Sequence, residues 1–215
     1  MQALLGIFFF SLLTTGASLE CVVCRGQTFC TGTKEPCPSA DDVCYMTLAE
    51  RPKDNTTVTK VVKGCLSPDL CKIWFEIYLG QDKHIRESTV CCSKENCSPD
   101  SPELPRMPPD VNGKFCPSCY SKNDECPEEY VYCTGGNAFC IGFITVTDTN
   151  VVNSTMKGCI SESGCQTLQS MNRPLSAFPN MRNVTCSQAK VSQASRAAPS
   201  LAYPLLVLLL MKLLL

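Results

Sequence analysis

The spacing of the cysteines constrains this chain more than any other feature of its sequence. Eight cysteines of the first half recur in the same order in the second half, each 94 to 96 positions later. The matched pairs are Cys21 and Cys116, Cys24 and Cys119, Cys30 and Cys126, Cys37 and Cys133, Cys44 and Cys140, Cys65 and Cys159, Cys71 and Cys165, and Cys91 and Cys186. A Lys-Gly-Cys motif ends at Cys65 and again at Cys159. Self-similarity at a fixed period indicates a duplicated structural unit, so the sequence predicts two copies of one domain.

The number of cysteines indicates an exported, disulfide-bonded protein. All 18 lie between residues 19 and 186, where about one residue in ten is cysteine, a density typical of disulfide scaffolds. The even count allows nine bridges in an oxidising compartment. Each copy is short enough that an apolar core alone gives marginal stability, whereas closing a loop of about 15 residues by a disulfide contributes roughly 3 kcal/mol. The net charge of −1 gives no indication of nucleic acid or an anionic membrane as a partner.

Both ends of the chain have the composition of targeting signals. Residues 1–18 are uncharged, contain an apolar run and end in small residues, which predicts a cleaved signal peptide. Residues 201–215 are apolar except for Lys212, too short for a spanning helix, and follow a polar spacer at 187–200 that is rich in small residues. This pattern predicts the removable tail of a glycosylphosphatidylinositol (GPI) signal. Ser192 is the preferred attachment site, with Ser187 and Ser195 as alternatives.

Three sequons predict N-glycosylation on Asn55, Asn153 and Asn183. A fourth, at Asn96, has Cys97 in its middle position and is discounted because that cysteine is expected to be bridged. Sugars on these residues agree with an extracellular location.

The segments between the cysteines predict an all-β fold. Residues 43–65, 72–92 and 141–159 each contain two stretches rich in Val, Thr, Ile or Tyr around a polar turn, which is typical of a β-hairpin. The last of these turns is expected at 148–150. No segment between the ends shows a convincing helical period. A proline-rich linker is predicted at 99–114, between a first domain at 19–98 and a second domain at 115–186.

This plan resembles the three-finger fold of the lymphocyte-antigen-six and urokinase-receptor family (uPAR-type or LU domains). Leu19, Cys21 and Cys24 match the family's Leu-x-Cys-x-x-Cys opening, and the Cys91-Cys92 doublet with Cys97 matches its closing signature. The tandem arrangement resembles the two-domain branch of gamma-type phospholipase inhibitors and GPI-anchored surface proteins. Two features depart from the family: Ser98 follows the last cysteine of the first domain where Asn is usual, and the second domain lacks the doublet and its short loop.

The resemblance also implies a pairing that the cysteine count alone leaves open. The implied pairs are Cys21 with Cys44, Cys24 with Cys30, Cys37 with Cys65, Cys71 with Cys91, Cys92 with Cys97, Cys116 with Cys140, Cys119 with Cys126, Cys133 with Cys159, and Cys165 with Cys186.

The resemblance implies a protein-binding function, in which loops on a rigid base grip a protein ligand. The leading hypothesis is a GPI-anchored binding module of the receptor or adhesion type at the outer face of the cell membrane. The alternative is a secreted gamma-type phospholipase inhibitor. Trp74, Phe75 and Tyr78 are aromatic candidates for ligand contact, but period-2 alternation puts Phe75 opposite the other two, so that one set is expected to pack inward.

Catalysis is not expected. The single histidine, His84, is predicted to lie in a solvated turn and has no evident catalytic partner in sequence. The Cys-x-x-Cys pairs at Cys21 and Cys116 are expected to be oxidised, which leaves no thiolates for a metal. The sequence therefore predicts no catalytic residues, no metal site and no cofactor.

Overall fold

The computed structural model describes residues 18–53, 56–71, 73–80, 82–94, 97–122, 125–127, 129–171 and 180–192. By their contacts these residues divide into two compact units. The first consists of residues up to 75 together with 85–105, and the second of residues 76–84 together with those from 106 onward. The predicted signal peptide, apart from Ser18, and the predicted apolar tail lie outside the described residues.

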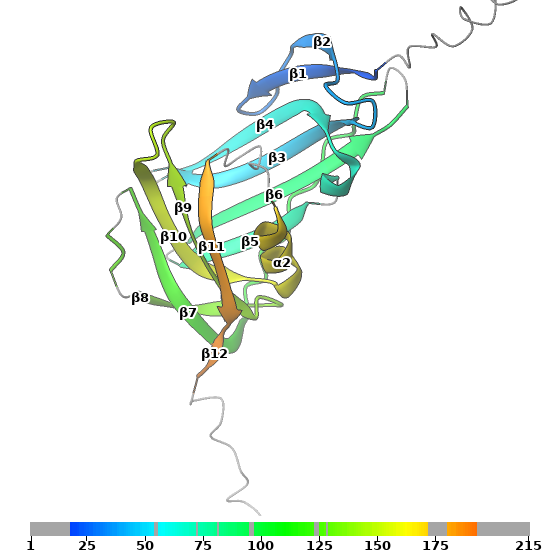
Figure 1. The fold of residues 1–215 in the computed structure, drawn as a ribbon. Coiled ribbons are helices and arrows are strands. Elements are labelled where there is room, and N and C mark those ends of the chain that lie inside the picture. The colour runs from blue at the N-terminus through cyan, green and yellow to red at the C-terminus, as the bar shows by residue number, and fades with distance from the viewer. Residues whose placement is uncertain are drawn as a thin grey trace, which may run out of the picture. The chain divides into compact units, whose positions relative to one another are not determined.

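The first unit is built on antiparallel strands that carry its hairpins. Its elements are β1 (Glu20–Gly26), β2 (Thr33–Pro36), β3 (Val43–Lys53), β4 (Thr56–Leu66), the short 3-10 helix η1 (Pro68–Leu70), the start of β5 (Trp74–Gly80) and most of β6 (Lys83–Cys92). β3 pairs with β4 on one side and β6 on the other, β4 also pairs with β1, and β1 pairs with β2 (Figure 1). The predicted hairpin of residues 43–65 is therefore formed by β3 and β4.

The first half of β3 is covered on both faces. Residues 43–47, VCYMT, are buried without a break, which requires cover on both sides of the strand. At one end of the strands lies a sulfur-rich cluster of Cys21, Cys37 and Cys44, against which Leu19 and Cys97 pack. The disulfides therefore form part of the core of this small unit, as its size requires.

The second unit repeats the plan with one addition. Its elements are β7 (Val111–Ser121), β8 (Glu129–Thr134), β9 (Phe139–Val146), β10 (Val152–Ile160), α2 (Glu162–Ser170), β11 (Met181–Gln188) and β12 (Lys190–Val191). β9 lies between β10 and β11, β10 also pairs with β7, and β7 pairs with β8 and β12. The β9–β10 hairpin turns at residues 148–150, as predicted.

The tip of the β5–β6 hairpin belongs to the second unit. Tyr78 pairs with Cys159 and Ile77 pairs with Ile160, so residues 76–80 form a strand beside β10. Ser118 Oγ donates a hydrogen bond to the carbonyl of Leu79. Each compact unit is therefore made of separate stretches of the sequence.

The helix α2 was not predicted. It carries only Gly164, Cys165 and Leu168 as buried residues, too few apolar side chains to produce a clear helical period. Ser161 caps it, because its Oγ accepts a hydrogen bond from the backbone N–H of Gly164 at 3.1 Å. The capping serine followed by Glu162 was the one local signal for this helix.

The proline-rich segment is more closely packed than a free connector. Residues 97–109 form neither helix nor strand, yet Pro102 and Pro105 are buried. Within the first unit, Arg86 Nη1 donates a hydrogen bond to the carbonyl of Pro105 at 3.0 Å. Two prolines of the predicted linker are therefore buried, and its bounds at 99–114 stay a prediction.

Candidate binding surfaces

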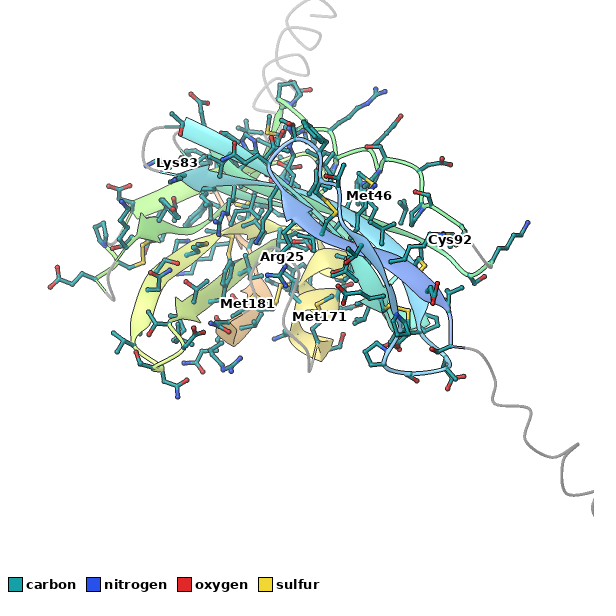
Figure 2. The ribbon with its side chains drawn as sticks, turned by 90° about the horizontal axis from the view of Figure 1, so that it is seen from above. Arg25, Met46, Lys83, Cys92, Met171 and Met181 are labelled. Carbon is teal, nitrogen blue, oxygen red and sulfur yellow. A yellow bond between two sulfur atoms is a disulfide. The ribbon has the colours of Figure 1, made fainter. Side chains whose placement is uncertain are left out.

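The nine disulfides form the base from which the hairpins extend. The structure joins Cys21 to Cys44, Cys24 to Cys30, Cys37 to Cys65, Cys71 to Cys91, Cys92 to Cys97, Cys116 to Cys140, Cys119 to Cys126, Cys133 to Cys159, and Cys165 to Cys186. These are the pairs that the family resemblance implies. Each bridge lies within one unit. Figure 2 draws the bridges as yellow bonds and labels Cys92 of the doublet.

Two groups of sulfur atoms have the spacing of a metal site without its chemistry. Cys21, Cys37 and Cys65 form one group, and Cys116, Cys133 and Cys159 form the other, with the sulfurs of each group within 4.8 Å of one another. Every one of these cysteines is in a disulfide. Metals bind the thiolate form, so in the oxidised protein these groups pack as core and offer no ligand.

The aromatic residues of the β5–β6 hairpin differ in their surroundings. Trp74 is 57% exposed, whereas Phe75 is 1% exposed. Tyr78 packs against the buried cluster of Cys116, Val131, Cys133 and Cys159 in its own unit. Phe75 is thus the inward-facing member of the alternation, and Tyr78 contributes to folding of the second unit. Among the three aromatic candidates for ligand contact, only Trp74 is exposed.

The tip of this hairpin is also less solvated than the sequence suggests. His84 is half-buried at the start of β6, and its Nδ1 lies 3.3 Å from the carbonyl oxygen of Asp82. Lys83, labelled in Figure 2, places its Nζ 5.8 Å from the centre of the Tyr120 ring. The prediction of a free turn at these residues was wrong, because they pack within the second unit.

Two of the predicted glycosylation sites are exposed. Asn153 lies near the start of β10, beside the hairpin turn, and Asn183 lies near the start of β11 with a φ of 55°. Both side chains lie on the surface, and Asn153 Nδ2, the atom that would carry the sugar, lies 3.5 Å from Thr145 Oγ1. Asn55, the predicted site on the β3–β4 turn, lies outside the described residues.

The second unit exposes a group of aromatic residues that sequence reasoning missed. β8 alternates, with Val131 and Cys133 buried inward and Tyr130 and Tyr132 exposed at 58% and 57%. Between the two tyrosines lies Phe115 of β7, with ring-centre distances of 5.7 Å to Tyr130 and 6.5 Å to Tyr132, both edge-to-face. The alternation in the letters YVYC at 130–133 was the signal that could have revealed it.

This group continues onto β12. Lys190 pairs with Phe115, so its side chain lies on the same side of the sheet as that ring, whereas Val191 pairs with Lys114 and lies on the other side. The residues Phe115, Tyr130, Tyr132 and Lys190 are called the aromatic face below. Together with Val131, Val191 and Ser192 they line a shallow hollow of about 500 Å³. A smaller hollow of about 280 Å³ in the first unit has a mixed lining that includes Arg25, Glu35 and Lys63.

One buried carboxyl group stands out in the first unit. Glu87 of β6 pairs with Ala49 of β3, which pairs in turn with Lys60 of β4. Burial raises the pKa of Glu87 to about 8, against the opposing effect of Lys60, and the side chain is 1% exposed. The pKa of Lys60 is lowered by burial and by the positive charges of Arg51 and Arg25. Figure 2 labels Arg25. Nothing in this arrangement provides a nucleophile or an acid–base pair facing a cleft.

The candidate attachment sites differ in their structural roles. Ser187 lies inside β11, where it pairs with Cys140 of β9. Ser192 directly follows β12, and its N–H donates to the carbonyl of Gly113 at 2.8 Å. Ser195 lies outside the described residues. Within the described part of the chain, no helix has the length and apolar character required to cross a membrane.

Comparisons with known proteins match both halves of the chain. The phospholipase A2 inhibitor family model matches residues 19–99, and the u-PAR/Ly-6 domain model matches residues 112–195. The phospholipase A2 inhibitor CgMIP-I from Cerrophidion godmani is 31% identical over 71% of this chain and 78% of its own length. The phospholipase A2 inhibitor CNF from Crotalus durissus terrificus is 30% identical over 84% of this chain and 92% of its own length. Inhibitors of the gamma type, from Gloydius brevicaudus siniticus, are similar at 31% identity.

Among solved structures, the crystal structure of mouse TEX101 is similar, with 20% identity, a TM-score of 0.38, and coverage of 79% of this chain and 98% of that chain. The assignment depends on the sequence matches, which cover both domains and the relatives' length. The chain therefore belongs to the lymphocyte-antigen-six and urokinase-receptor family, in the two-domain branch that contains the gamma-type phospholipase A2 inhibitors.

Proposed function

We propose that this chain acts outside the cell as a binding protein for a phospholipase A2, and that it performs no catalysis of its own. The similarity to two-domain phospholipase A2 inhibitors, which extends over 188 residues for one relative, is the observation that carries this proposal. It supports the inhibitor alternative more strongly than a general receptor or adhesion role. The described chain is consistent with a binding module, since disulfide-stapled hairpins offer extended exposed edges.

The test is a direct binding and inhibition assay with secreted phospholipases A2. Purified protein is titrated against a panel of these enzymes by surface plasmon resonance, and hydrolysis of phosphatidylcholine is followed in parallel. We expect saturable binding to at least one member and a decrease in its hydrolysis rate in proportion to occupancy. Protein whose disulfides have been reduced and alkylated serves as the control. Absence of binding across the panel would contradict the proposal.

We further propose that the chain is attached to the cell surface by a GPI anchor. The composition of residues 187–215 supports this second function, a membrane-held binding protein. Ser192 is the favoured site because it directly follows β12. Processing at Ser187 would remove residues 188–192, and with them the hydrogen bond from Ala189 N–H to the carbonyl of Ala138 and the pairing of β12 with β7.

Treatment of intact expressing cells with phosphatidylinositol-specific phospholipase C tests the anchor. We expect release of the protein into the medium, and mass spectrometry of its C-terminal peptide should place ethanolamine on Ser192. Ser192→Val should redirect or prevent attachment, because the attachment site requires a small residue, whereas Ser187→Val, which keeps the strand N–H of β11, should leave the attachment site unchanged. Retention on treated cells, or secretion without treatment, would exclude the anchor and leave the inhibitor proposal standing.

The remaining assignments from the sequence stay proposals. They are a signal peptide at 1–18, domains at 19–98 and 115–186, and N-linked sugars on Asn55, Asn153 and Asn183. Peptide mapping of the glycoprotein without reduction, before and after deglycosylation, tests the sugars and the nine disulfides in one measurement.

A further inference from the structure

The aromatic face is a largely apolar, exposed surface on strands β7, β8 and β12 of the second unit. Tyr130 and Tyr132 are more than half exposed, and Phe115 lies between them in edge-to-face contact with both. On the opposite side of β8, the side chains of Val131 and Cys133 pack in the core. The exposed residues therefore do not complete the core, and surface groupings of this kind mark contact with another apolar partner.

The position of this face within the chain indicates the partner. Lys190 belongs to the face, and Val191 and Ser192 line its hollow. Ser192 is also the residue at which we propose that the lipid is attached. The glycan of a GPI anchor lies between the attached residue and the lipid, so an anchor at Ser192 keeps the face within reach of the headgroups without fixing its distance from them.

The chemistry of the face fits the boundary between headgroups and acyl chains. Tyrosine has an apolar ring and a polar hydroxyl, and tyrosine and tryptophan are enriched at membrane interfaces for that reason. Lys190 pairs with Phe115 and lines the same hollow. Lysine side chains next to buried aromatic rings can extend their ammonium groups to lipid phosphates.

The predicted sugar on Asn153 lies away from this face. Thr155 of β10 pairs with Ser121 of β7, so Asn153 lies beyond the end of β7 that is opposite to Phe115. The separation along the strands is roughly eight residues, or about 26 Å at the rise of a β-strand. Glycans on Asn153 would therefore leave the aromatic face accessible.

We propose that the aromatic face docks on the phospholipid surface to which the chain is attached, with the rings of Phe115, Tyr130 and Tyr132 inserted among the headgroups of the outer leaflet. This inference rests on the proposed attachment at Ser192. It adds a second, non-covalent contact, and a single lipid anchor gains stability from a second contact of this kind.

Trp74, the single tryptophan of the chain, makes a sharp test feasible. The Trp74→Phe and Tyr132→Trp double variant carries its one indole on the aromatic face, whereas the native protein carries its one indole on the first unit, where Trp74 is exposed. Each full-length anchored protein is purified from cells and reconstituted in plain or chain-brominated phosphatidylcholine vesicles. We expect brominated lipid to reduce the fluorescence of the double variant about twofold, because interfacial insertion places side chains about 5–10 Å deep. A Trp74→Phe and Val151→Trp variant, with its indole at the exposed β9–β10 turn of the same unit, should be quenched less.

A matched pair of variants measures the contribution of the face to affinity. Lipid-free protein, released with phosphatidylinositol-specific phospholipase C, is sedimented with phosphatidylcholine vesicles. We expect Tyr130→Ser with Tyr132→Ser to lower its partition coefficient by roughly tenfold, as loss of two partly buried rings implies. The control, Phe29→Ser with Trp74→Ser, removes two exposed aromatic residues of the first unit and should leave the coefficient unchanged.

The two proposals fail in different ways. Flotation of the reconstituted protein with vesicles reports attachment alone, and protein that does not float contradicts the anchor. In that case the partition measurement is made with secreted, lipid-free protein and decides whether the face docks. Protein that floats without quenching overturns the docking. Shielding of the Tyr132→Trp indole from acrylamide by a phospholipase A2, or by self-association, would also overturn it and assign the face to a protein partner.

Discussion

At the scale of single residues, Glu87 is the side chain with the strongest consequence for stability. It is 1% exposed, and within the described residues its Oε2 has no hydrogen-bond partner. Ionising such a group costs free energy that the half-buried Lys60 only partly offsets. We infer that Glu87 is protonated in the folded protein at neutral pH.

This protonation predicts a fall in stability as the pH rises. The unfolded chain ionises Glu87 above about 4.5, its ordinary pKa, whereas the folded protein holds the proton up to about 8. Between these values the folded state binds more protons, so the free energy of unfolding decreases with pH and then levels off. Glu87→Gln should remove this slope and be more stable than the native protein at pH 8 by a few kcal/mol. Denaturant unfolding at pH 4.5, 6 and 8 with disulfides intact checks this, with exposed Glu35→Gln as the control. Equal slopes in all three proteins would contradict it.

Two glycines in the repeated Lys-Gly-Cys motif have different roles. A Cβ on Gly158 would lie 2.2 Å from the backbone oxygen of Tyr78, whereas a Cβ on Gly64 would first meet the ring of Tyr45 at 3.3 Å. The first contact is with backbone and cannot relax without separating β10 from β5. The second is with a side chain that can shift by a few tenths of an ångström.

The repeat therefore supplies its own matched control. We expect Gly158→Ala to destabilise the protein by about 3 kcal/mol or more, or to prevent its secretion, and Gly64→Ala to cost less than about 1 kcal/mol. Thermal unfolding of both variants is the measurement. Equal effects would show that the close approach of β10 and Tyr78 does not form.

At the scale of elements, α2 depends on its ends because its apolar face is narrow. Ser161 supplies the N-terminal cap, and the disulfide from Cys165 to Cys186 ties the helix to β11. Ser161→Ala should lower the free energy of unfolding by about 1 kcal/mol, whereas Ser161→Asp, which can cap equally well, should retain native stability. Denaturant unfolding of the two variants tests this, and a loss in both would mean that Ser161 acts by other means than capping.

At the scale of the whole molecule, the second unit is not contiguous in sequence. It includes residues 76–84, which lie before the proline-rich segment, and their strand covers one edge of β10. A second half expressed from Arg106 onward would lack that strand. Separate expression of the two halves therefore does not reproduce the two units.

We expect the isolated second half to lose protection along β10. Successive strand N–H groups point to opposite edges, so one of the two amides of Cys159 and Ile160 faces β5 and the other faces β9. The amide that faces β5 should exchange faster than in the full chain by about tenfold or more, because its strand partner is missing. Amides between β9 and β11 should keep their protection and serve as the control. Unchanged exchange at both Cys159 and Ile160 would contradict the inclusion of residues 76–84 in the second unit.

The amino-acid sequence was sufficient for features that depend on local pattern or on the repeat. The all-β class and family were predicted correctly, as were the β3–β4 and β9–β10 hairpins with the turn at 148–150, because strand composition and turn residues are encoded over short stretches. The duplicated cysteines led to the two-domain plan, and the resemblance implied the pairing that the structure contains.

Only the tertiary structure decided which side chains are exposed. Period-2 alternation put Trp74 and Phe75 on opposite sides of a strand, but contacts with other strands determined that Phe75 packs inward and that Tyr78 joins the second unit. The aromatic face likewise requires β7, β8 and β12 to come together from residues that lie far apart in the chain. A local pattern specifies which residues share a face, whereas the burial of that face depends on long-range partners that a single sequence does not reveal.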